Sequence, residues 1–272
     1  MSFYPPDVES KTQRAIDRCL SDYNAVVSIS EKDKALTKYG ENALLGTSEA
    51  TVMQLPAGID NETYVSTNII DSISTNDADA AGSLRVEGHY LDADNNFIFH
   101  VQFPTLNGQS EVALSQPLAR ISRLRKVAGS TVLAASKLVY GYDNTDVTLA
   151  SGVPNVDAQV HIIMDSNEGT SGKGASTISN NDFYFIEGLL LGVNKKTTAT
   201  VDFRLRVREQ GGDFITTIPK ITLTNTTGSR YFPLPEIEIV PSNADFKVTS
   251  VSSASNTEAT CGVFGILAKK LN

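Results

Sequence analysis

Alternation of apolar and polar residues is clearest in the run TVDFRLRVRE, residues 200–209. Successive side chains of a strand point to opposite faces, so this pattern predicts a half-buried β-strand. The following Gln-Gly-Gly-Asp, residues 210–213, predicts a tight turn, and apolar residues at 214–218 predict a return strand. The exposed face of this hairpin would carry a row of three arginines, Arg204, Arg206 and Arg208.

Short β-rich runs bounded by Gly, Asn, Asp and Pro continue from about residue 50 to the C-terminus. Such spacing is typical of a sandwich or barrel. Asn107-Gly108 predicts a type I′ hairpin, and residues 92–96 predict a turn between two strands. The expected strands lie in residues 83–92, 96–103, 131–141, 158–164, 182–193, 200–209, 235–241, 245–253 and 259–268.

The first forty or so residues have a helical pattern instead. Pro5 and Pro6 precede Asp7, which suits a helix N-cap. Ser30 and Asp33 resemble a capping box that opens a second helix, which Gly40 would end. A terminal helix of about fifteen residues is marginal alone, so its apolar stripe needs a partner on this chain or on a neighbouring subunit. The stripe comprises Val8, Ala15, Ile16, Cys19, Leu20 and Tyr23.

These patterns predict a mainly β protein: an antiparallel, jelly-roll-like β-sandwich with a short helical N-terminal arm. The arm is expected over residues 1–47 and the sandwich region over 48–272. A basic cluster followed by a Gly-Ser break marks a candidate subdivision near residues 126–130. All-β domains of this size also occur undivided, so one domain and two subdomains both stay open.

Charge limits what the arginine row can bind. Lys plus Arg number 23 against 31 for Asp plus Glu among 272 residues, which gives a net charge of −8. The field around such a protein repels phosphate backbones, so we expect no direct contact with nucleic acid. The three arginines are expected to pair with carboxylates of their own chain, or else to form a subunit contact or capture a ligand.

Targeting signals and cysteine pairs are not evident in the sequence. Cys19 and Cys261 belong to no metal-ligand spacing and are interpreted as buried small apolar residues. The N-terminal residues have no secretory pattern, and no run of eighteen apolar residues occurs. We therefore expect neither export nor a membrane contact.

Motifs for catalysis, cofactors or metals fail on spacing. The Gly172-Lys173 pair has neither the upstream Gly nor the following Ser or Thr of a phosphate loop, and Asp92, Asp94 and Asn96 lack the later residues of a calcium loop. His89, His100 and His161 lie in β runs without a carboxylate or Cys pattern, and are interpreted as structural. We expect no catalytic, cofactor-binding or metal-binding residue and no enzymatic activity.

Three stretches together carry a resemblance to a known group of proteins. They are GHYLDADNNFIFHVQFPTLNGQSEV with the R-I-x-R segment and Gly-containing strand that follow, NDFYFIEGLLLGVNKKTTATVDFRLRVREQGGDFIT, and IVPSNADFKVTSVSSASNTEATCGVFGIL with its P-x-x-A-D-F-x-V step. Over residues 84–267 this pattern resembles structural proteins of tailed bacteriophages. The resemblance implies a β-sandwich virion component that serves in head decoration, at a vertex, as an adaptor or in the tail.

The resemblance also implies partners and a location. The chain would form a symmetric homo-oligomer, with a trimer as first choice, and would dock to other virion proteins such as the major capsid or tail proteins. It would be assembled in the host cytoplasm and would reside in the virion. Interface residues would be Val8, Ile16, Leu20 and Tyr23 on the arm and Arg204, Arg206 and Arg208 on the sheet.

Two alternatives stay open. One is a receptor- or carbohydrate-binding module of a phage tail or fibre, for which Tyr140, Tyr142 and Tyr184 are the nearest aromatic candidates. The other is a glycan-cleaving enzyme on the same scaffold, because the distance between two catalytic carboxylates is set by the fold.

Overall fold

The computed structural model describes residues 27–28, 34–56, 59, 63–194, 198–218, 220–224 and 228–270. Strands dominate this part of the chain, and every strand pair in it is antiparallel. Its single helical element is the 3-10 turn η1 (Asp157–Gln159). The prediction of a mainly β, antiparallel protein is confirmed. None of the helices in the described ranges has the length and apolarity to cross a membrane.

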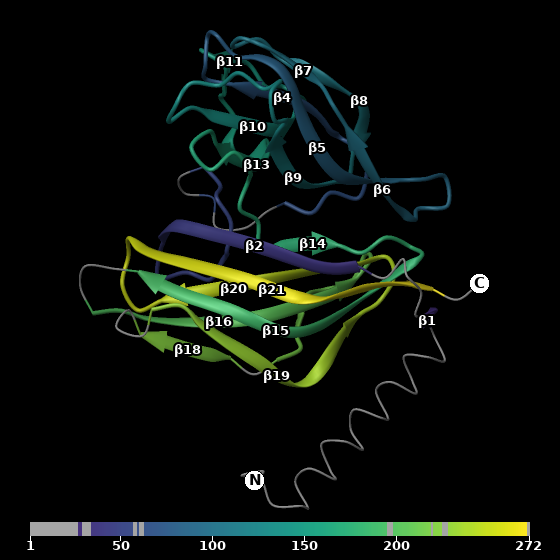
Figure 1. The fold of residues 1–272 in the computed structure, drawn as a ribbon, viewed down its shortest axis with the longest axis vertical. Helices are drawn as coiled ribbons and strands as arrows, with labels where there is room; N and C mark the ends of the chain where they lie inside the picture. The colour runs from purple at the N-terminus through teal and green to yellow at the C-terminus, as the bar shows by residue number, and fades with distance from the viewer. Residues whose placement is uncertain are drawn as a thin grey trace, which may run out of the picture.

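Two β lobes are stacked along the long axis of the molecule (Figure 1). The first lobe has a sheet of order β13-β10-β4-β8, a second sheet in which β5 pairs with β6, β7 and β9, and a β11-β12 hairpin. Its main core draws on both large sheets, with Ile73 of β4, Val86 of β5 and Leu124 of β9 fully buried. The strands are β4 (Ile70–Thr75), β5 (Ala81–Leu91), β6 (Phe97–Gln102), β7 (Thr105–Asn107), β8 (Val112–Leu118), β9 (Arg120–Lys126), β10 (Leu138–Asp143), β11 (Leu149–Ala150), β12 (Val153–Pro154) and β13 (Val160–Asp165).

The second lobe also consists of two sheets around one core. In the first, which we call the β21 sheet, the order is β1-β21-β15-β19 and β2 also pairs with β21; in the other, the β16 sheet, the order is β14-β20-β16-β17, with β18 on β16 and β3 on β20. Tyr184 and Val263 from the β21 sheet and Phe203 and Phe246 from the β16 sheet belong to the same buried cluster. The strands are β1 (Val27–Ser28), β2 (Lys34–Leu45), β3 (Ala50–Thr51), β14 (Ala175–Thr177), β15 (Asp182–Asn194), β16 (Thr200–Glu209), β17 (Ile215–Thr216), β18 (Ile221–Thr224), β19 (Arg230–Val240), β20 (Ala244–Ser252) and β21 (Thr257–Lys270).

Strand β16 confirms the alternation from which its position was predicted. Its odd-numbered apolar side chains, among them Phe203 and Leu205, are buried, and its arginines lie on the opposite, half-exposed face. Val207 pairs with Ile215, so the predicted 200–218 hairpin also forms. The finer prediction of a jelly-roll-like sandwich stays a prediction.

The second expected helix of the N-terminal arm is wrong. Residues 34–45 form β2, which pairs antiparallel with β21 from Lys34↔Leu267 to Leu45↔Thr257. Gly40 lies within this strand, where a Cβ would come 2.1 Å from the Val52 carbonyl oxygen and 2.2 Å from the Gly174 backbone nitrogen. The glycine therefore permits close backbone packing rather than ending a helix. The first expected helix, with Val8, Ile16, Leu20 and Tyr23, lies outside the described residues.

The sequence crosses from one lobe to the other between β3 and β4 and again between β13 and β14. Residues 126–130 lie at the end of β9 and in the turn after it, within the first lobe. In this turn the backbone N–H of Thr131 donates to the Val127 carbonyl at 3.0 Å.

Asn107-Gly108 does form a turn, but β7 pairs with β5 and β8 pairs with β4, so the expected local hairpin is wrong. The turn at residues 92–96 is confirmed between β5 and β6, with Asp92 Oδ1 accepting the backbone N–H of Asp94 and of Asn96 at 2.9 Å each.

Packing between the two sheets of the second lobe predicts the effect of Phe203→Ala. Phe203 is 1% exposed, and its removal should lower the free energy of unfolding by about 3–5 kcal/mol through lost burial and a cavity. The matched variant Ile215→Ala, at a side chain that is 64% exposed, should change it by no more than about 0.5 kcal/mol. Urea unfolding measures both, and equal effects of the two variants would contradict this packing.

Candidate functional site

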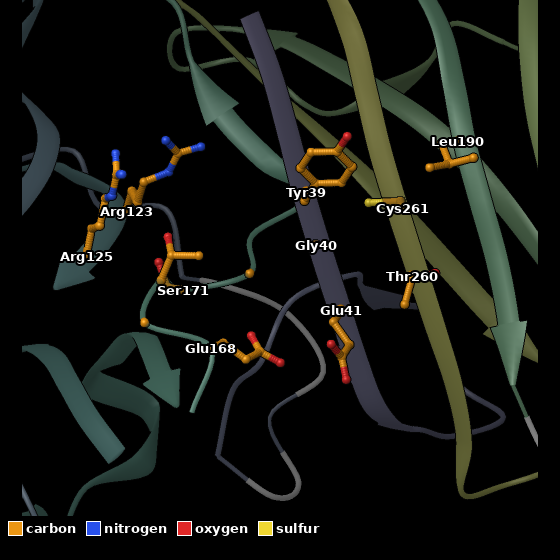
Figure 2. A pocket seen from close by; sticks show the side chains of 13 residues that line it. Tyr39, Gly40, Glu41, Arg123, Arg125, Glu168, Ser171, Leu190, Thr260 and Cys261 are labelled. Carbon is orange, nitrogen blue, oxygen red and sulfur yellow. The ribbon is translucent and has the colours of Figure 1, made fainter. Parts of the chain in front are cut away.

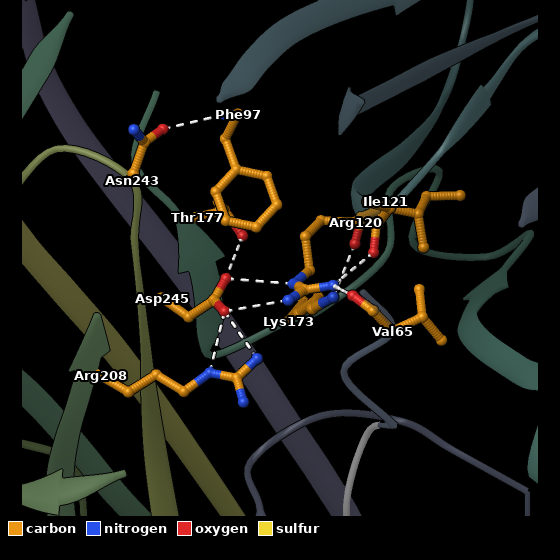
Figure 3. A network of polar contacts seen from close by, with 10 residues as sticks. Val65, Phe97, Arg120, Ile121, Lys173, Thr177, Arg208, Asn243 and Asp245 are labelled. Atoms are coloured by element: carbon orange, nitrogen blue, oxygen red, sulfur yellow. Dashed lines mark hydrogen bonds and ion pairs between the residues drawn. The ribbon is translucent and has the colours of Figure 1, made fainter. Parts of the chain in front are cut away.

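A buried ion pair joins the two lobes. Arg120, at the start of β9 in the first lobe, donates from Nε and Nη2 to the two carboxylate oxygens of Asp245 in β20, at 3.2 Å each. The two side chains are 6% and 0% exposed. The Nη1 group of Arg120 also donates to the carbonyl oxygens of Val65 and of Ala119. Figure 3 shows this guanidinium between the Asp245 carboxylate and Val65.

Asp245 also receives hydrogen bonds from its own lobe. Thr177 Oγ1 donates to Oδ1, and Arg208 donates to Oδ2 from Nη2 at 2.8 Å and from Nε at 3.0 Å. Burial by itself would raise the pKa of this carboxyl. The charge and hydrogen bonds of Arg120, with Thr177 and Arg208, hold the pKa below its usual range. The carboxylate is therefore fully paired, and it couples the lobes through two guanidinium groups.

Two backbone contacts beside this pair fix the same junction. The backbone N–H of Phe97, in β6 of the first lobe, donates to Asn243 Oδ1 at 2.9 Å, and the Phe97 carbonyl accepts the N–H of Asn180 at 3.0 Å. The Phe97 ring lies 5.1 Å from the Arg120 guanidinium carbon, and the Tyr64 ring lies 5.0 Å from it. Charge, ring and backbone contacts thus hold the lobes together at one place.

The predicted arginine row pairs with carboxylates of its own chain. Arg206 donates to both oxygens of Glu49, at 2.8 and 2.7 Å, and Arg204 lies 3.4 Å from the same carboxylate. Arg208 pairs with Asp245. Intramolecular pairing was the first of the expected alternatives for this row. Its role in a subunit contact stays a prediction.

The outward-facing side of the β21 sheet carries a group of apolar side chains, which we call the outer face. Phe264 of β21 lies at its centre, with Tyr39 of β2 and Tyr231 of β19 each packed edge-on against it at centroid distances of 5.7 and 5.9 Å. Tyr39 and Tyr231 are about half exposed. The outer face comprises Tyr39, Phe185, Tyr231, Ile237, Ile239, Phe264 and Ile266.

Beside the outer face, a cleft of about 650 Å³ lies between the lobes. Arg123 and Arg125 of β9 form its wall in the first lobe, and Tyr39 of β2 and Leu190 of β15 form part of its wall in the second (Figure 2). The loop of residues 168–172 lies along a third side. We consider this cleft and the outer face together as the candidate functional site.

Carboxylates gather at one end of the cleft. Glu41 and Glu168 line it, and a smaller adjoining cavity of about 160 Å³ adds Asp165. Burial raises the pKa of Glu41, and the negative charges of Glu168, Glu258 and Asp165 raise it further. The cleft is therefore polarised, with guanidinium groups in one part and carboxylates in another.

The aromatic candidates named from the sequence do not form an exposed platform. Tyr140 is 6% exposed, and Tyr142 and Tyr184 are fully buried, so that interpretation is wrong. Tyr184 fills the core of the second lobe, whereas Tyr140 and Tyr142 lie on the other face of β10 from Val139, in a cluster with Leu149 of β11 and Val153 of β12. The exposed rings of Tyr39 and Tyr231 were missed, because whether a strand residue points inward depends on register.

Histidines and loop motifs are in structural surroundings. His89 and His161 are buried, and His89 pairs with Phe99 across β5 and β6. In the part of the chain that the structure describes, no group of three or more His, Cys, Asp or Glu could hold a metal. Lys173 lies 4% exposed and donates from Nζ to the Ile121 carbonyl at 2.6 Å, so it supports the lobe junction. Cys261 is buried as expected, and burial raises the pKa of its thiol to about 12.

Sequence reasoning missed the lobe junction and the cleft. The candidate subdivision near residues 126–130 was taken from the basic cluster and the Gly-Ser break, although residues 120–126 form the strand β9. The spacing of Arg123, Leu124 and Arg125 alone could have placed the two arginines on one face of a strand. The partnership of Arg120 with Asp245 joins residues 125 positions apart, for which the sequence has no local signal.

Comparisons with known proteins add no assignment. No family model matches the chain, and no curated protein matches it. Among solved structures, the VP2 subviral particle of infectious bursal disease virus is 10% identical over 93% of this chain and 76% of that chain, with a TM-score of 0.19. The Cry4Aa toxin of Bacillus thuringiensis is 10% identical over 93% of this chain and 55% of that chain, with a TM-score of 0.20. The tandem CBM22 modules of Paenibacillus barcinonensis Xyn10C are 9% identical over 90% of this chain and 96% of that chain, with a TM-score of 0.16. Scores this low carry no argument about fold or function.

The buried pair predicts a large cost for Asp245→Asn. Loss of the carboxylate charge leaves Arg120 buried without its ionic partner, so the free energy of unfolding should fall by about 3–5 kcal/mol. The matched control is Asp202→Asn, which breaks the surface pair of Asp202 with Lys220 on the same sheet and should cost about 0–1 kcal/mol. Urea unfolding compares them, and a double-mutant cycle with Arg120→Met should give a coupling of about 1–3 kcal/mol. Similar losses in both Asn variants would show that the buried pair has no special role.

Burial of His89 predicts a pH dependence of stability. Burial, followed by the charges of Lys38, Arg120 and Lys173, lowers the pKa of His89 to about 3, although Asp245 opposes this. The unfolded chain binds a proton at about pH 6.5 and the folded chain does not, so stability should fall as pH drops from about 6.5 toward 3. His89→Gln removes this contribution, and its stability should fall less steeply than that of the wild type over this range. Urea unfolding at stepped pH measures the slopes, and identical slopes would refute the assignment to His89.

Proposed function

We propose that this chain is a non-enzymatic structural protein of a virus particle, of the kind found in tailed bacteriophages, that acts by self-association and by docking to other virion proteins. The observation that carries the proposal is the outer face. Five large apolar side chains of one sheet, Tyr39, Tyr231, Ile237, Ile239 and Ile266, are each at least 37% exposed. Exposed apolar surface concentrated on one face typically marks an interaction site.

The occupant that we propose for the outer face is the N-terminal arm of a second copy. The arm carries an apolar stripe at helical spacing with Val8, Ile16, Leu20 and Tyr23. Such a stripe is stable only when it is buried against apolar surface. Residues 1–26 lead into β1, which joins the β21 sheet at Val27↔Lys270. This part of the arm is therefore tethered to the sheet that bears the outer face. The net charge of −8 on each copy opposes association, so the contact has to draw its stability from apolar surface.

Several parts of the proposal follow from the sequence resemblance. The assembly is a closed homo-oligomer, with a trimer as first choice. The other partners are virion proteins such as the major capsid or tail proteins, with no direct contact with nucleic acid or membrane. The protein is assembled in the host cytoplasm and resides in the virion as a head decoration, vertex, head–tail or tail component, with a jelly-roll-like sandwich as its fold.

A second candidate function is a receptor- or carbohydrate-binding module of a phage tail or fibre. The observation that favours it is the cleft, where the half-exposed ring of Tyr39 lies near the arginines of β9. The two functions are compatible, because a virion protein can both pack against its copies and present a cleft.

Self-association through the outer face predicts the effect of Ile239→Glu. A carboxylate buried in an apolar contact between negatively charged copies should convert the trimer to monomer. The monomer itself should keep its melting temperature, because Ile239 is 47% exposed within one copy. Deletion of residues 1–26 should have the same effect. The control is Ile215→Glu, at an exposed position of the other sheet, which should remain trimeric.

Size-exclusion chromatography with light scattering measures these masses. A wild type that is monomeric at every concentration, or an Ile239→Glu variant that stays trimeric, would overturn the proposal.

A further inference from the structure

The cleft between the lobes has features of a binding site of its own, and it shares only Tyr39 with the outer face. Its volume of about 650 Å³ lies within the range of small-molecule sites, which occur preferentially between domains. Figure 2 shows Arg123 and Arg125 beside one another on one side, Tyr39 across from them, and Glu41 and Glu168 together at another side. Each group offers a different kind of contact to one ligand.

The two guanidinium groups can receive an anion. Arg123 and Arg125 are two positions apart on β9, so their side chains share a face of the strand. Neither has a side-chain hydrogen bond or ion pair with the described part of the chain, whereas Arg120, Arg206 and Arg208 each pair with a carboxylate. A planar carboxylate is a natural partner for guanidinium, since it accepts two parallel hydrogen bonds.

The opposite end of the cleft excludes a highly charged anion. Glu41 and Glu168 are close enough to Asp165 and Glu258 that their charges disfavour ionisation of Glu41. A polyphosphate, a nucleic acid or an acidic peptide would be repelled there. A ligand with one carboxylate and several hydroxyl groups fits both ends, because hydroxyl groups donate hydrogen bonds to carboxylates.

Tyr39 supplies a surface for the body of such a ligand. Its side chain is about half exposed, and Phe264 supports it from the outer face with an edge-on contact at 5.7 Å. A supported ring with one free side can pack against the apolar face of a sugar ring. Thr170 and Thr260 add hydroxyl groups to the lining of the cleft.

We propose that this cleft binds an acidic saccharide of the uronic acid type, with the sugar carboxylate on Arg123 and Arg125, a sugar ring against Tyr39 and sugar hydroxyls toward Glu41 and Glu168. Polymers of such sugars are candidate attachment surfaces for a particle that carries this protein. The saccharide shares only Tyr39 with the outer face, and all its contacts come from one copy, so its binding does not require the self-association proposed above.

Isothermal titration calorimetry of the full chain with cellobiouronate, a disaccharide with a single carboxylate, tests this site. The wild type should bind cellobiouronate and should not bind the neutral disaccharide cellobiose or triglutamate. The double variant Arg123→Gln with Arg125→Gln should weaken cellobiouronate binding at least tenfold, as should Tyr39→Ala. Arg230→Gln is the matched control, because Arg230 lies at the exposed start of β19, outside the cleft, and this variant should bind as the wild type does.

Three results would overturn the proposal. They are the absence of cellobiouronate binding at millimolar concentration, binding that the double arginine variant leaves unchanged, and equal binding of triglutamate, which would assign the cleft to an acidic peptide. Thermal melts of the variants establish that each is folded. Light scattering on the same samples reports self-association separately, so the failure of one proposal is distinguishable from the failure of the other.

Discussion

The arrangement of this molecule depends on one buried carboxylate. Asp245 is fully buried between two guanidinium groups, one from each lobe, and its negative charge is what makes burial of Arg120 tolerable. Because a buried charge tolerates little displacement of its partner, this contact fixes β9 of the first lobe relative to β20 of the second. The cleft wall with Arg123 and Arg125 is the continuation of that same strand. The geometry of the candidate binding site thus follows from the ion pair.

The two proposed functions use neighbouring surfaces of one sheet. Phe264 supports both Tyr39, which faces the cleft, and Tyr231, which belongs to the part of the outer face on β19. A sheet is well suited to this double use, because its inward side chains supply the stability and its outward ones are free to vary. In the β21 sheet, Tyr184 and Val263 fill the core, and the exposed residues between them are available for contacts.

Local patterns predicted the strands well and their partners poorly. Alternation located β16 to the residue, and turn residues located the β5–β6 connection at 92–96, because both depend on neighbouring residues. Residues 34–45 misled the prediction, since Gly40 and a capping pattern suit a helix end locally, whereas pairing with β21, more than 200 positions away, decides the structure. The cleft could not be predicted for the same reason: it combines β2, β9, β15 and β21. The charge composition, by contrast, made the pairing of Arg204, Arg206 and Arg208 with carboxylates of the same chain predictable.

Hydroxyl-radical footprinting of the full chain at low and high concentration tests the central claim most directly, because it reports which side chains become covered as copies associate. The account predicts that oxidation of Tyr231 and Phe264 on the outer face falls in the associated protein, whereas oxidation of Phe99 and Phe103, two exposed rings of the first lobe, stays unchanged. Protection of Phe99 and Phe103 with Tyr231 still fully oxidised would contradict it, and would place the contact between copies on the first lobe.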